Sequence, residues 1–262
     1  ELARQIAATK PAKLILLDHS EYNLYSIDRE IAEHAPTVSR RAVLGDVRDQ
    51  VFLDQVFCAE RPELVFHAAA LKHVPLAESN PCEAVLTNVI GTRHVADASE
   101  AFGATAMVQI STDKAVNPSS LMGATKRLAE SYCQALDRKT TGGKTRYVTV
   151  RFGNVLGSTG SVVPLFQRQL AQGGPLTVTH PEVARYFMTV REAVELILQA
   201  STLAIESNGI VTNPSAANAG QLYVLDMGEP ILIQHLARQI IRLSGLRPDV
   251  DVAIEYIGLR AG

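Results

Sequence analysis

Short apolar segments alternate with longer amphipathic ones along the first 150 residues of the chain. The apolar segments lie at Leu14–Leu17, Leu64–Phe66, Met107–Ile110 and Tyr147–Val150. An apolar run without alternating polar positions is typical of a strand that is buried on both faces of a parallel sheet. The stretches between these runs have the length of helices, roughly at Glu21–His34, Asp49–Phe57, Glu83–Ala101 and Leu121–Asp137. This alternation predicts right-handed crossovers and an α/β fold with a doubly wound parallel sheet.

The pattern changes after about Arg151, where glycine and proline become frequent and we expect strands to be sparse. Helices are predicted around Val163–Gln172, Val190–Leu203 and Ile231–Leu243, with a strand at Leu222–Leu225. We therefore predict two lobes, at residues 1–151 and 152–262, with the second interleaved with the first.

Composition narrows the class of protein only mildly. The 262 residues are 47% hydrophobic, and a net charge of −2 gives no general reason to expect nucleic acid or an anionic membrane surface. Cys58, Cys82 and Cys133 form no CxxC pair, so neither a zinc site nor a disulfide framework is predicted. No run of about 18 apolar residues is present and the start does not resemble a signal peptide. We expect this part of the protein to be cytoplasmic and to make no membrane contact.

Two polar motifs carry the candidate chemistry. Ser111, Thr112, Asp113 and Lys114 follow an apolar run, and open α/β sheets bind ligands outside the carboxyl ends of their strands. A carboxyl group can act as an acid and an amine as a base. On the next predicted helix, Lys126 stands four residues after Met122. Each residue alone also fits an ordinary role: a loop aspartate, a surface lysine or a methionine that fills a core gap. Their combination favours a catalytic site.

These motifs resemble the nucleotide-sugar 4,6-dehydratases of the extended short-chain dehydrogenase/reductase superfamily. In that superfamily a tyrosine stands four residues before the lysine, and Met122 at that position resembles the large, membrane-anchored branch of polysaccharide biosynthesis proteins. The resemblance implies a Rossmann fold and the NAD-dependent dehydration of a UDP-hexose, with UDP-N-acetylglucosamine preferred. The sugar would be oxidised at C4, lose water between C5 and C6, and receive hydride at C6, yielding a 4-keto-6-deoxy sugar nucleotide for bacterial polysaccharide or glycan biosynthesis.

The resemblance also implies a role for each of five catalytic residues. Lys114 would remove the C5 proton and Asp113 would protonate the departing 6-hydroxyl group. Thr112 would orient the 4-hydroxyl group, whose proton would pass to Asp113 or to water, because the thioether of Met122 cannot transfer a proton. Met122 would line the site, and Lys126 would hold the nicotinamide ribose.

Cofactor contacts are expected in the first lobe. Asp18 ends a strand where a carboxylate accepts the hydroxyl groups of the adenosine ribose; the alternative is an N-cap of the following helix, and both roles can hold together. No cation for a 2′-phosphate follows it in His19-Ser20-Glu21, which favours NAD over NADP. The resemblance adds Asp46 and Val47 at the adenine, Ala68 and Ala69 at a close backbone approach, and Lys72, Asn88 and Ser111. An ordinary loop residue, simple packing or a solvated lysine is the alternative for several of these.

Substrate contacts are expected in the second lobe. The segment from Arg151 to Pro164 is rich in glycine, which suits a loop whose backbone approaches a ligand. The resemblance implies contacts with the UDP-sugar from Asn154, Ser161, Val162, Thr177, Arg185 and Arg260. Arginine suits the diphosphate because its charged fork has a fixed geometry. No histidine lies at a spacing that suggests a metal site, and the resemblance implies a homo-oligomer.

A glycine-rich dinucleotide-binding loop is absent from the printed sequence, which has no GxGxxG motif. The chain resembles the family from the helix that follows this loop. We therefore expect a preceding strand to lie between Leu14–Leu17 and Leu64–Phe66, so that these two strands do not pair directly. The resemblance also implies a membrane region in the full-length parent, which would anchor it to the bacterial inner membrane.

Three other functions stay open at this point. A nucleotide-sugar 4-epimerase shares the fold and cofactor, but it needs no acid at C6 and normally keeps the tyrosine. A non-catalytic domain that binds NAD or a nucleotide sugar would explain the missing tyrosine, whereas the intact Thr112-Asp113-Lys114 and Lys126 argue against it. The third is an inactive fragment. Sugar turnover would separate these functions from dehydration.

Overall fold

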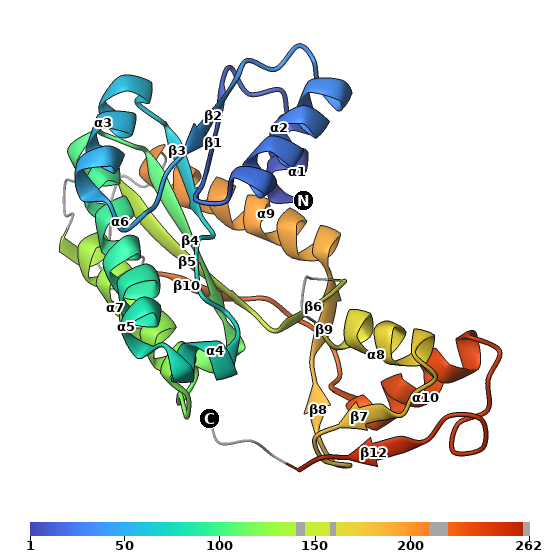
Figure 1. Cartoon of the computed structure of the whole chain (residues 1–262). Coiled ribbons are helices and arrows are strands. Elements are labelled where there is room, and N and C mark those ends of the chain that lie inside the picture. The colour runs from blue at the N-terminus through green and yellow to red at the C-terminus, as the bar shows by residue number, and fades with distance from the viewer. Residues whose placement is uncertain (140–144, 158–160, 210–219, 259–262) are drawn as a thin grey trace. The chain divides into compact units, whose positions relative to one another are not determined.

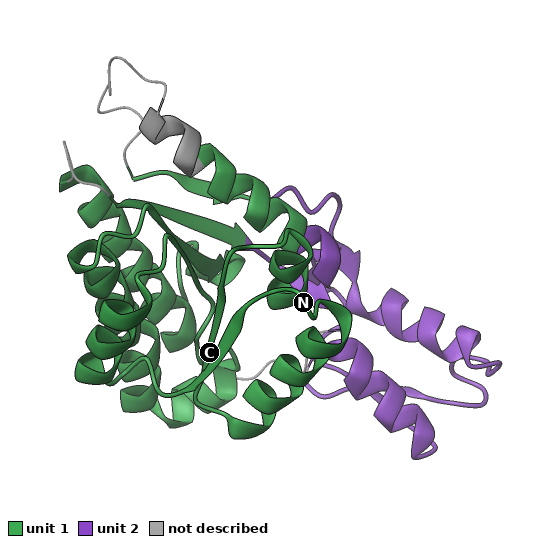
Figure 2. Cartoon of the chain, turned by 90° about the horizontal axis from the view of Figure 1, so that it is seen from above, with its two compact units in different colours: residues 1–151, 194–224 green, residues 152–193, 225–262 purple. Residues whose placement is uncertain are grey.

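The computed structural model describes residues 1–139, 145–157, 161–209 and 220–258, with the backbone alone at 204–209. The chain divides into two compact units (Figure 2). The first consists of Glu1–Arg151 and Val194–Val224, and the second of Phe152–Ala193 and Leu225–Gly262. A boundary thus falls after Arg151, and a segment from the later part of the chain returns to the first unit.

Parallel strands form the centre of the first unit. Strand β1 (Leu14–Asp18) pairs with β2 (Arg40–Leu44) in one two-stranded sheet. A second sheet has the order β10-β5-β4-β3, from Leu222–Val224, Arg146–Phe152, Ala106–Thr112 and Leu64–His67. β3 is parallel to β4 and β10 is parallel to β5. The α/β fold with a parallel sheet that the apolar runs predict is confirmed.

Strands β1 and β3 belong to different sheets. Within the described ranges no ladder joins them, and β1 pairs with β2 while β3 pairs with β4. This agrees with the expectation that they do not pair directly. That a further strand fills the place between them stays a prediction.

Helices cover both sides of the larger sheet. Figure 1 shows α3 (Gln50–Glu60), α6 (Thr92–Ala101) and α7 (Leu121–Lys139) on one side, and α9 (Val190–Gly209) on the other. Helix α2 (Glu21–His34) packs on β1 together with α1 (Leu2–Ala8). The main core lies where α3, α6 and α7 meet the sheet, and it includes Leu53, Phe57, Val95, Met107, Cys133 and Tyr147.

One predicted helix is interrupted. The stretch Glu83–Ala101 was expected as a single helix, but the structure has the end of α5 (Pro81–Val85), a π-helix η1 (Leu86–Gly91) and then α6. Single π-turns inside helices are rare, and those that occur lie frequently at functional sites. Here the turn contains Asn88, whose side chain is fully buried. The short helix α4 (Val74–Ser79) precedes α5.

The second unit is built from short strands and two helices. Strand β6 (Asn154–Leu156) pairs with β9 (Phe187–Thr189), β7 (Leu176–Val178) with β12 (Ile254–Tyr256), and β8 (Ala184–Arg185) with β11 (Ile231–Leu232). Helices α8 (Val162–Ala171) and α10 (Ile233–Leu243) pack with β7 around Phe166, Leu176 and Ile241.

The expectation that strands are sparse after Arg151 is therefore wrong. The strands of the second unit have two or three residues each, which is too short to show a periodic pattern in the sequence. For the same reason Ile231 and Leu232, expected in a helix, form a strand before α10 begins. Within the described residues, no helix has both the length and the apolar character needed to cross a membrane.

Candidate active site

Three side chains at the carboxyl end of β4 are joined by hydrogen bonds. Thr112 Oγ1 donates to Asp113 Oδ1 at 2.8 Å, and Lys114 Nζ donates to the same oxygen at 3.0 Å. Thr112 Oγ1 also accepts the backbone N–H of Lys114 at 3.3 Å, as the N-cap of the 3₁₀ turn η2 (Asp113–Ala115). The side chains of Lys114 and Asp113 remain about one-third exposed, at 34% and 30%. A hydroxyl group, a carboxyl group and an amine thus meet at a strand end within reach of solvent.

Helix α7 lies directly against this turn. Gly123 is buried, and a Cβ atom built on it would lie 2.2 Å from the carbonyl oxygen of Lys114. Lys126, one turn further along the helix, donates from Nζ to the carbonyl oxygen of Ile110 at 2.6 Å. The structure therefore brings Lys126 of the helix to β4, at Ile110, three residues before Asp113.

Burial lowers the pKa of Lys126 to about 8, against the opposing influence of Cys133 and Glu130. Only 5% of the residue is exposed, and a low dielectric disfavours the charged ammonium form. Burial likewise lowers the pKa of His67 to about 3, and the charge of Lys126 adds to this effect. His67 is therefore neutral near pH 7, with its Nε2 atom 2.9 Å from Thr92 Oγ1. Thr92 Oγ1 donates to Asn88 O, so His67 Nε2 must carry the proton of this bond.

Met122 is packed in an apolar cluster. Its residue is 3% exposed, and it contacts Ala77 and Ala84, with Leu71 and Leu121 at the edge of the cluster. These apolar neighbours are sufficient to explain an apolar side chain of this size at position 122. Its expected place lining the active site stays a prediction.

Asn88 connects the turn after β3 to α7. Its Oδ1 accepts the N–H of Leu71 at 2.8 Å, while its Nδ2 donates to Leu71 O at 3.0 Å and to Thr125 Oγ1 at 3.0 Å. A buried amide with these three bonds holds the Leu71 backbone at a fixed distance from α7. The role of propping the neighbourhood of the site, expected from the resemblance, is compatible with this geometry.

The expected cofactor residues lie in several places of the first unit. Ala68, Ala69 and Lys72 are exposed after β3, and Val47 is buried after β2. Asp18 ends β1 and accepts the N–H of Ser20 at 2.8 Å. The N-cap of α2 is Ser20, whose hydroxyl group accepts the N–H of Asn23, so the alternative of Asp18 as the cap is wrong.

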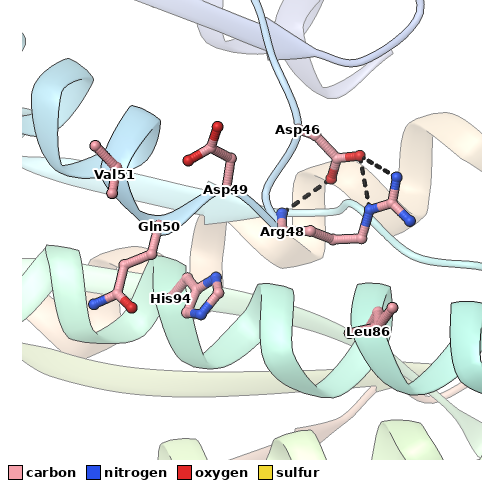
Figure 3. Close-up of a pocket in the computed structure, with 7 residues that line it drawn as sticks. All are labelled: Asp46, Arg48, Asp49, Gln50, Val51, Leu86 and His94. Carbon is pink, nitrogen blue, oxygen red and sulfur yellow. Dashed lines mark hydrogen bonds and ion pairs between the residues drawn. The ribbon is translucent and has the colours of Figure 1, made fainter.

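Asp46 lines a pocket whose volume is about 550 Å³. Figure 3 shows its carboxylate bound by Arg48, through the N–H at 2.9 Å and through Nε at 2.8 Å. The hydrogen bond from the Arg48 side chain is the main reason that the pKa of Asp46 is lowered. Both carboxylate oxygens are therefore engaged by Arg48 in this structure, a partner that the sequence did not suggest. The lining residues are Asp46, Arg48, Asp49, Gln50, Val51, Leu86 and His94.

The expected substrate residues lie in the second unit. Asn154 begins β6, and its N–H donates to Tyr186 O at 3.1 Å. Ser161 is the N-cap residue of α8, and its buried hydroxyl group has no hydrogen-bond partner among the described residues. Val162 opens α8, Thr177 is bonded to Gln169, and Arg185 is exposed in β8. Arg260 lies outside the described residues.

Sequence reasoning missed the buried partner of Ser111. Its hydroxyl group donates to Glu130 of α7 at 2.5 Å, and Glu130 is paired with Arg151 at the end of β5. Glu130 stands four residues after Lys126, so the helical period places both on one face, and this spacing was the available signal. No group of histidine, cysteine or carboxylate side chains within the described parts of the chain is arranged to hold a metal ion.

Comparisons with known proteins identify relatives of the whole printed chain. A family model described as polysaccharide biosynthesis protein matches residues 1–262. The capsular polysaccharide biosynthesis protein CapD of Staphylococcus aureus is 46% identical over 263 residues, covering 100% of this chain and 41% of CapD. A UDP-glucose 4-epimerase of Rickettsia rickettsii is 39% identical over 192 residues, covering 71% of this chain and 55% of that protein. The chain thus spans about two-fifths of the length of CapD.

Solved structures share the fold over nearly the same range. Pen from Bacillus thuringiensis is similar with a TM-score of 0.86 and 31% identity, over 100% of this chain and 75% of that chain. DesIV, a dTDP-glucose 4,6-dehydratase from Streptomyces venezuelae, is similar with a TM-score of 0.76 and 21% identity, over 97% of this chain and 80% of that chain. The match of the family model along the printed sequence, with CapD at this identity, shows that the chain belongs to the polysaccharide biosynthesis protein family.

Proposed function

We propose that this chain carries the catalytic site of an NAD-dependent nucleotide-sugar 4,6-dehydratase that acts on a UDP-hexose, with UDP-N-acetylglucosamine as the preferred substrate. The observation that carries the proposal is the joined set of Thr112, Asp113 and Lys114 at the end of β4. Dehydration needs an acid for the leaving hydroxyl group and a base for a carbon-bound proton, and these side chains offer one of each.

Several residues fit a bound dinucleotide. Asp18 presents a carboxylate at the end of β1, with 39% of its side chain exposed, where it would accept the hydroxyl groups of the adenosine ribose. Lys126 would hold the nicotinamide ribose, and Asp46 and Val47 would contact the adenine. The residues after Asp18 offer no Lys or Arg to a 2′-phosphate, which favours NAD over NADP. DesIV, which shares the fold, was crystallised with NAD bound.

The chain's own residues would then move protons in a fixed order. When bound, NAD supplies the acceptor for the hydride of C4 and the donor of hydride to C6. Thr112 orients the 4-hydroxyl group of the sugar. The proton of that 4-hydroxyl group passes to Asp113 as the C4 ketone forms. Lys114 removes the C5 proton, which the ketone makes acidic.

Elimination and reduction restore the protein. Asp113 protonates the 6-oxygen while the C6–O6 bond breaks, and water leaves with formation of the C5–C6 double bond. Lys114 then returns its proton to C5 as C6 is reduced. Asp113 and Lys114 both recover their starting protonation, and the sugar has lost one water molecule.

An isotope experiment tests this proposal on the full-length protein. UDP-N-acetylglucosamine labelled with deuterium at C4 is incubated with protein and NAD, and the product is analysed by NMR. Dehydration transfers the deuterium to the C6 methyl group and produces a C4 ketone. Recovery of unchanged substrate after long incubation would remove the proposal.

A UDP-glucose 4-epimerase is the second candidate, favoured by the Rickettsia rickettsii relative of that name. An epimerase would return the deuterium to C4 and yield the 4-epimer with its 6-hydroxyl group intact. The same experiment therefore distinguishes the two. The buried Met122 at the position of the expected tyrosine, together with an acid and base pair that epimerisation does not need, makes dehydration the preferred function.

A further inference from the structure

A fully buried carboxylate is bonded to the residue that precedes the proposed catalytic residues in β4. Glu130 is 0% exposed and belongs to α7. Its Oε1 accepts Ser111 Oγ at 2.5 Å and Arg151 Nε at 2.7 Å. Its Oε2 is bonded to Arg151 Nη2 and to Arg127 Nη1, the latter at 3.2 Å. One side chain thus connects the helix to the carboxyl ends of two neighbouring strands, β4 and β5.

The contacts of Glu130 belong to a row along one face of α7. Gly123 lies against Lys114 O, Lys126 donates to Ile110 O, and Glu130 accepts from Ser111 Oγ. The helix residues follow a spacing of three and four, which places them on one face. Their partners all lie within residues 110–114. Helix α7 therefore fastens the end of β4 at three successive points, immediately around Thr112 and Asp113.

A buried ion pair is a poor choice for stability alone. Moving a carboxylate and a guanidinium group out of water carries a large desolvation cost, and well-packed apolar side chains often stabilise a fold as well or better. What a carboxylate with four donors provides is a fixed orientation of each donor. Here one of those donors is the hydroxyl group of Ser111, the residue before Thr112.

We propose that Glu130 is a positioning residue of the active site: through Ser111 it holds the end of β4 so that Thr112, Asp113 and Lys114 keep their places relative to Lys126. Ser111 is 4% exposed, and its hydroxyl group is directed to Glu130. This gives Ser111 a role different from the direct cofactor contact expected from the sequence. The expected effect on turnover rests on the proposed function. The expected effect on the position of the end of β4 rests on the hydrogen bonds alone.

The test uses the full-length protein and removes one bond of the network at a time. Ser111→Ala deletes the link between Glu130 and β4 but leaves the Glu130–Arg151 pair intact. We expect kcat to fall roughly 10- to 100-fold, the cost of misplacing reacting groups by a fraction of an ångström to 1 Å. KM for the UDP-sugar and the affinity for NAD should stay within about twofold, because positioning acts on the reacting groups more than on binding. Loss of folded protein would also lower the apparent kcat at unchanged KM, so kcat is calculated per molecule of folded, NAD-binding protein.

Two further variants complete the set. Glu130→Gln keeps the shape of the side chain but removes its charge, and should lower kcat at least as much as Ser111→Ala. If Glu130→Gln fails to fold, Ser111→Ala still decides the question. Arg127→Gln is the matched control, because Arg127 also contacts Glu130 but its side chain is 46% exposed and, among the described residues, makes no hydrogen bond to β4 or β5. It should retain wild-type kcat.

Hydrogen exchange gives a readout that does not need turnover. Backbone amides of residues 112–116 should exchange faster in Ser111→Ala than in wild type, while those of α2 stay unchanged. Wild-type kcat together with wild-type exchange in Ser111→Ala would overturn the inference and leave the proposed function standing. Absence of turnover in the wild-type protein would overturn the proposed function, and the exchange rates would still decide whether Glu130 positions β4.

Discussion

Gly123 of α7 lies so close to Lys114 that no side chain fits between them. A Cβ atom on Gly123 would lie 2.2 Å from Lys114 O and 3.1 Å from both Lys114 C and the side chain of Pro118. The nearest atoms are backbone, which cannot turn aside as a flexible side chain can. The place of the Lys114 backbone therefore depends on the absence of a side chain at residue 123.

Gly123→Ala should reduce turnover by about 100-fold or more, since displacement of a reacting group by about 1 Å can have this effect. Helix propensity alone would stabilise this variant by up to about 1 kcal/mol, so propensity and the clash predict opposite outcomes. Steady-state kinetics with a thermal melt would separate them. Ala124→Gly, at the exposed neighbouring position, serves as the control. A Gly123→Ala variant with wild-type activity would show that the turn at residues 113–115 can shift without consequence.

Asp113→Asn should still bind NAD and the UDP-sugar but lose dehydration by on the order of 10²–10⁴-fold, the usual contribution of one general acid. The amide keeps the size of the carboxyl group and can still accept from Lys114, so folding should not change. Binding is measured by calorimetry and turnover by NMR of the product. Unchanged turnover would remove Asp113 from the mechanism.

Met122→Leu should be tolerated, because the two side chains have nearly equal volumes and such exchanges usually cost less than about 1.5 kcal/mol. The cluster with Ala77 and Ala84 needs an apolar side chain of this size. The measurements are urea unfolding and kcat. If kcat fell several hundred-fold in a fully folded variant, the sulfur atom would have a direct role in the reaction.

The lowered pKa of Lys126 makes stability depend on pH in a defined direction. The pKa of Lys126 is about 8 in the folded protein and 10.5 in the unfolded chain. Between these two pH values the unfolded state therefore binds more protons than the folded state. The cost of burying the ammonium group is fully present below pH 8 and is relieved as the pH rises toward 10.5. Wild type should therefore gain stability relative to Lys126→Met over this range, by about 3 kcal/mol at most.

Urea unfolding of both proteins at pH 7, 8, 9 and 10 would measure this difference. The other titratable side chains are the same in both proteins, so their contributions to the pH dependence cancel in the comparison. Parallel curves for the two proteins would mean that Lys126 keeps its ordinary pKa in the folded state.

The sequence by itself determined one long amphipathic helix and the strands that appear as short, continuous apolar runs. Helix α2 was predicted at its observed bounds, and β1, β3, β4 and β5 were placed within two residues at each end. Such segments are specified locally, because an apolar run of four residues fits a buried strand and a longer amphipathic stretch fits a helix. The candidate site, with Asp113, Lys114 and Lys126, was predicted from their place at the end of an apolar run and from the resemblance of these motifs to a known family.

Only the tertiary structure decided which groups meet. Glu130 is four residues from Lys126 in sequence, but nothing local shows that Ser111 and Arg151, from two other strands, would bind it. The π-turn that interrupts the helix contains Asn88, whose side chain is bonded to Leu71, 17 residues away. The short strands after Arg151 likewise pair with partners far along the chain, as β7 does with β12. Contacts between distant residues are chosen by packing and by the need to pair buried polar groups, and neither leaves a pattern in a single stretch of sequence.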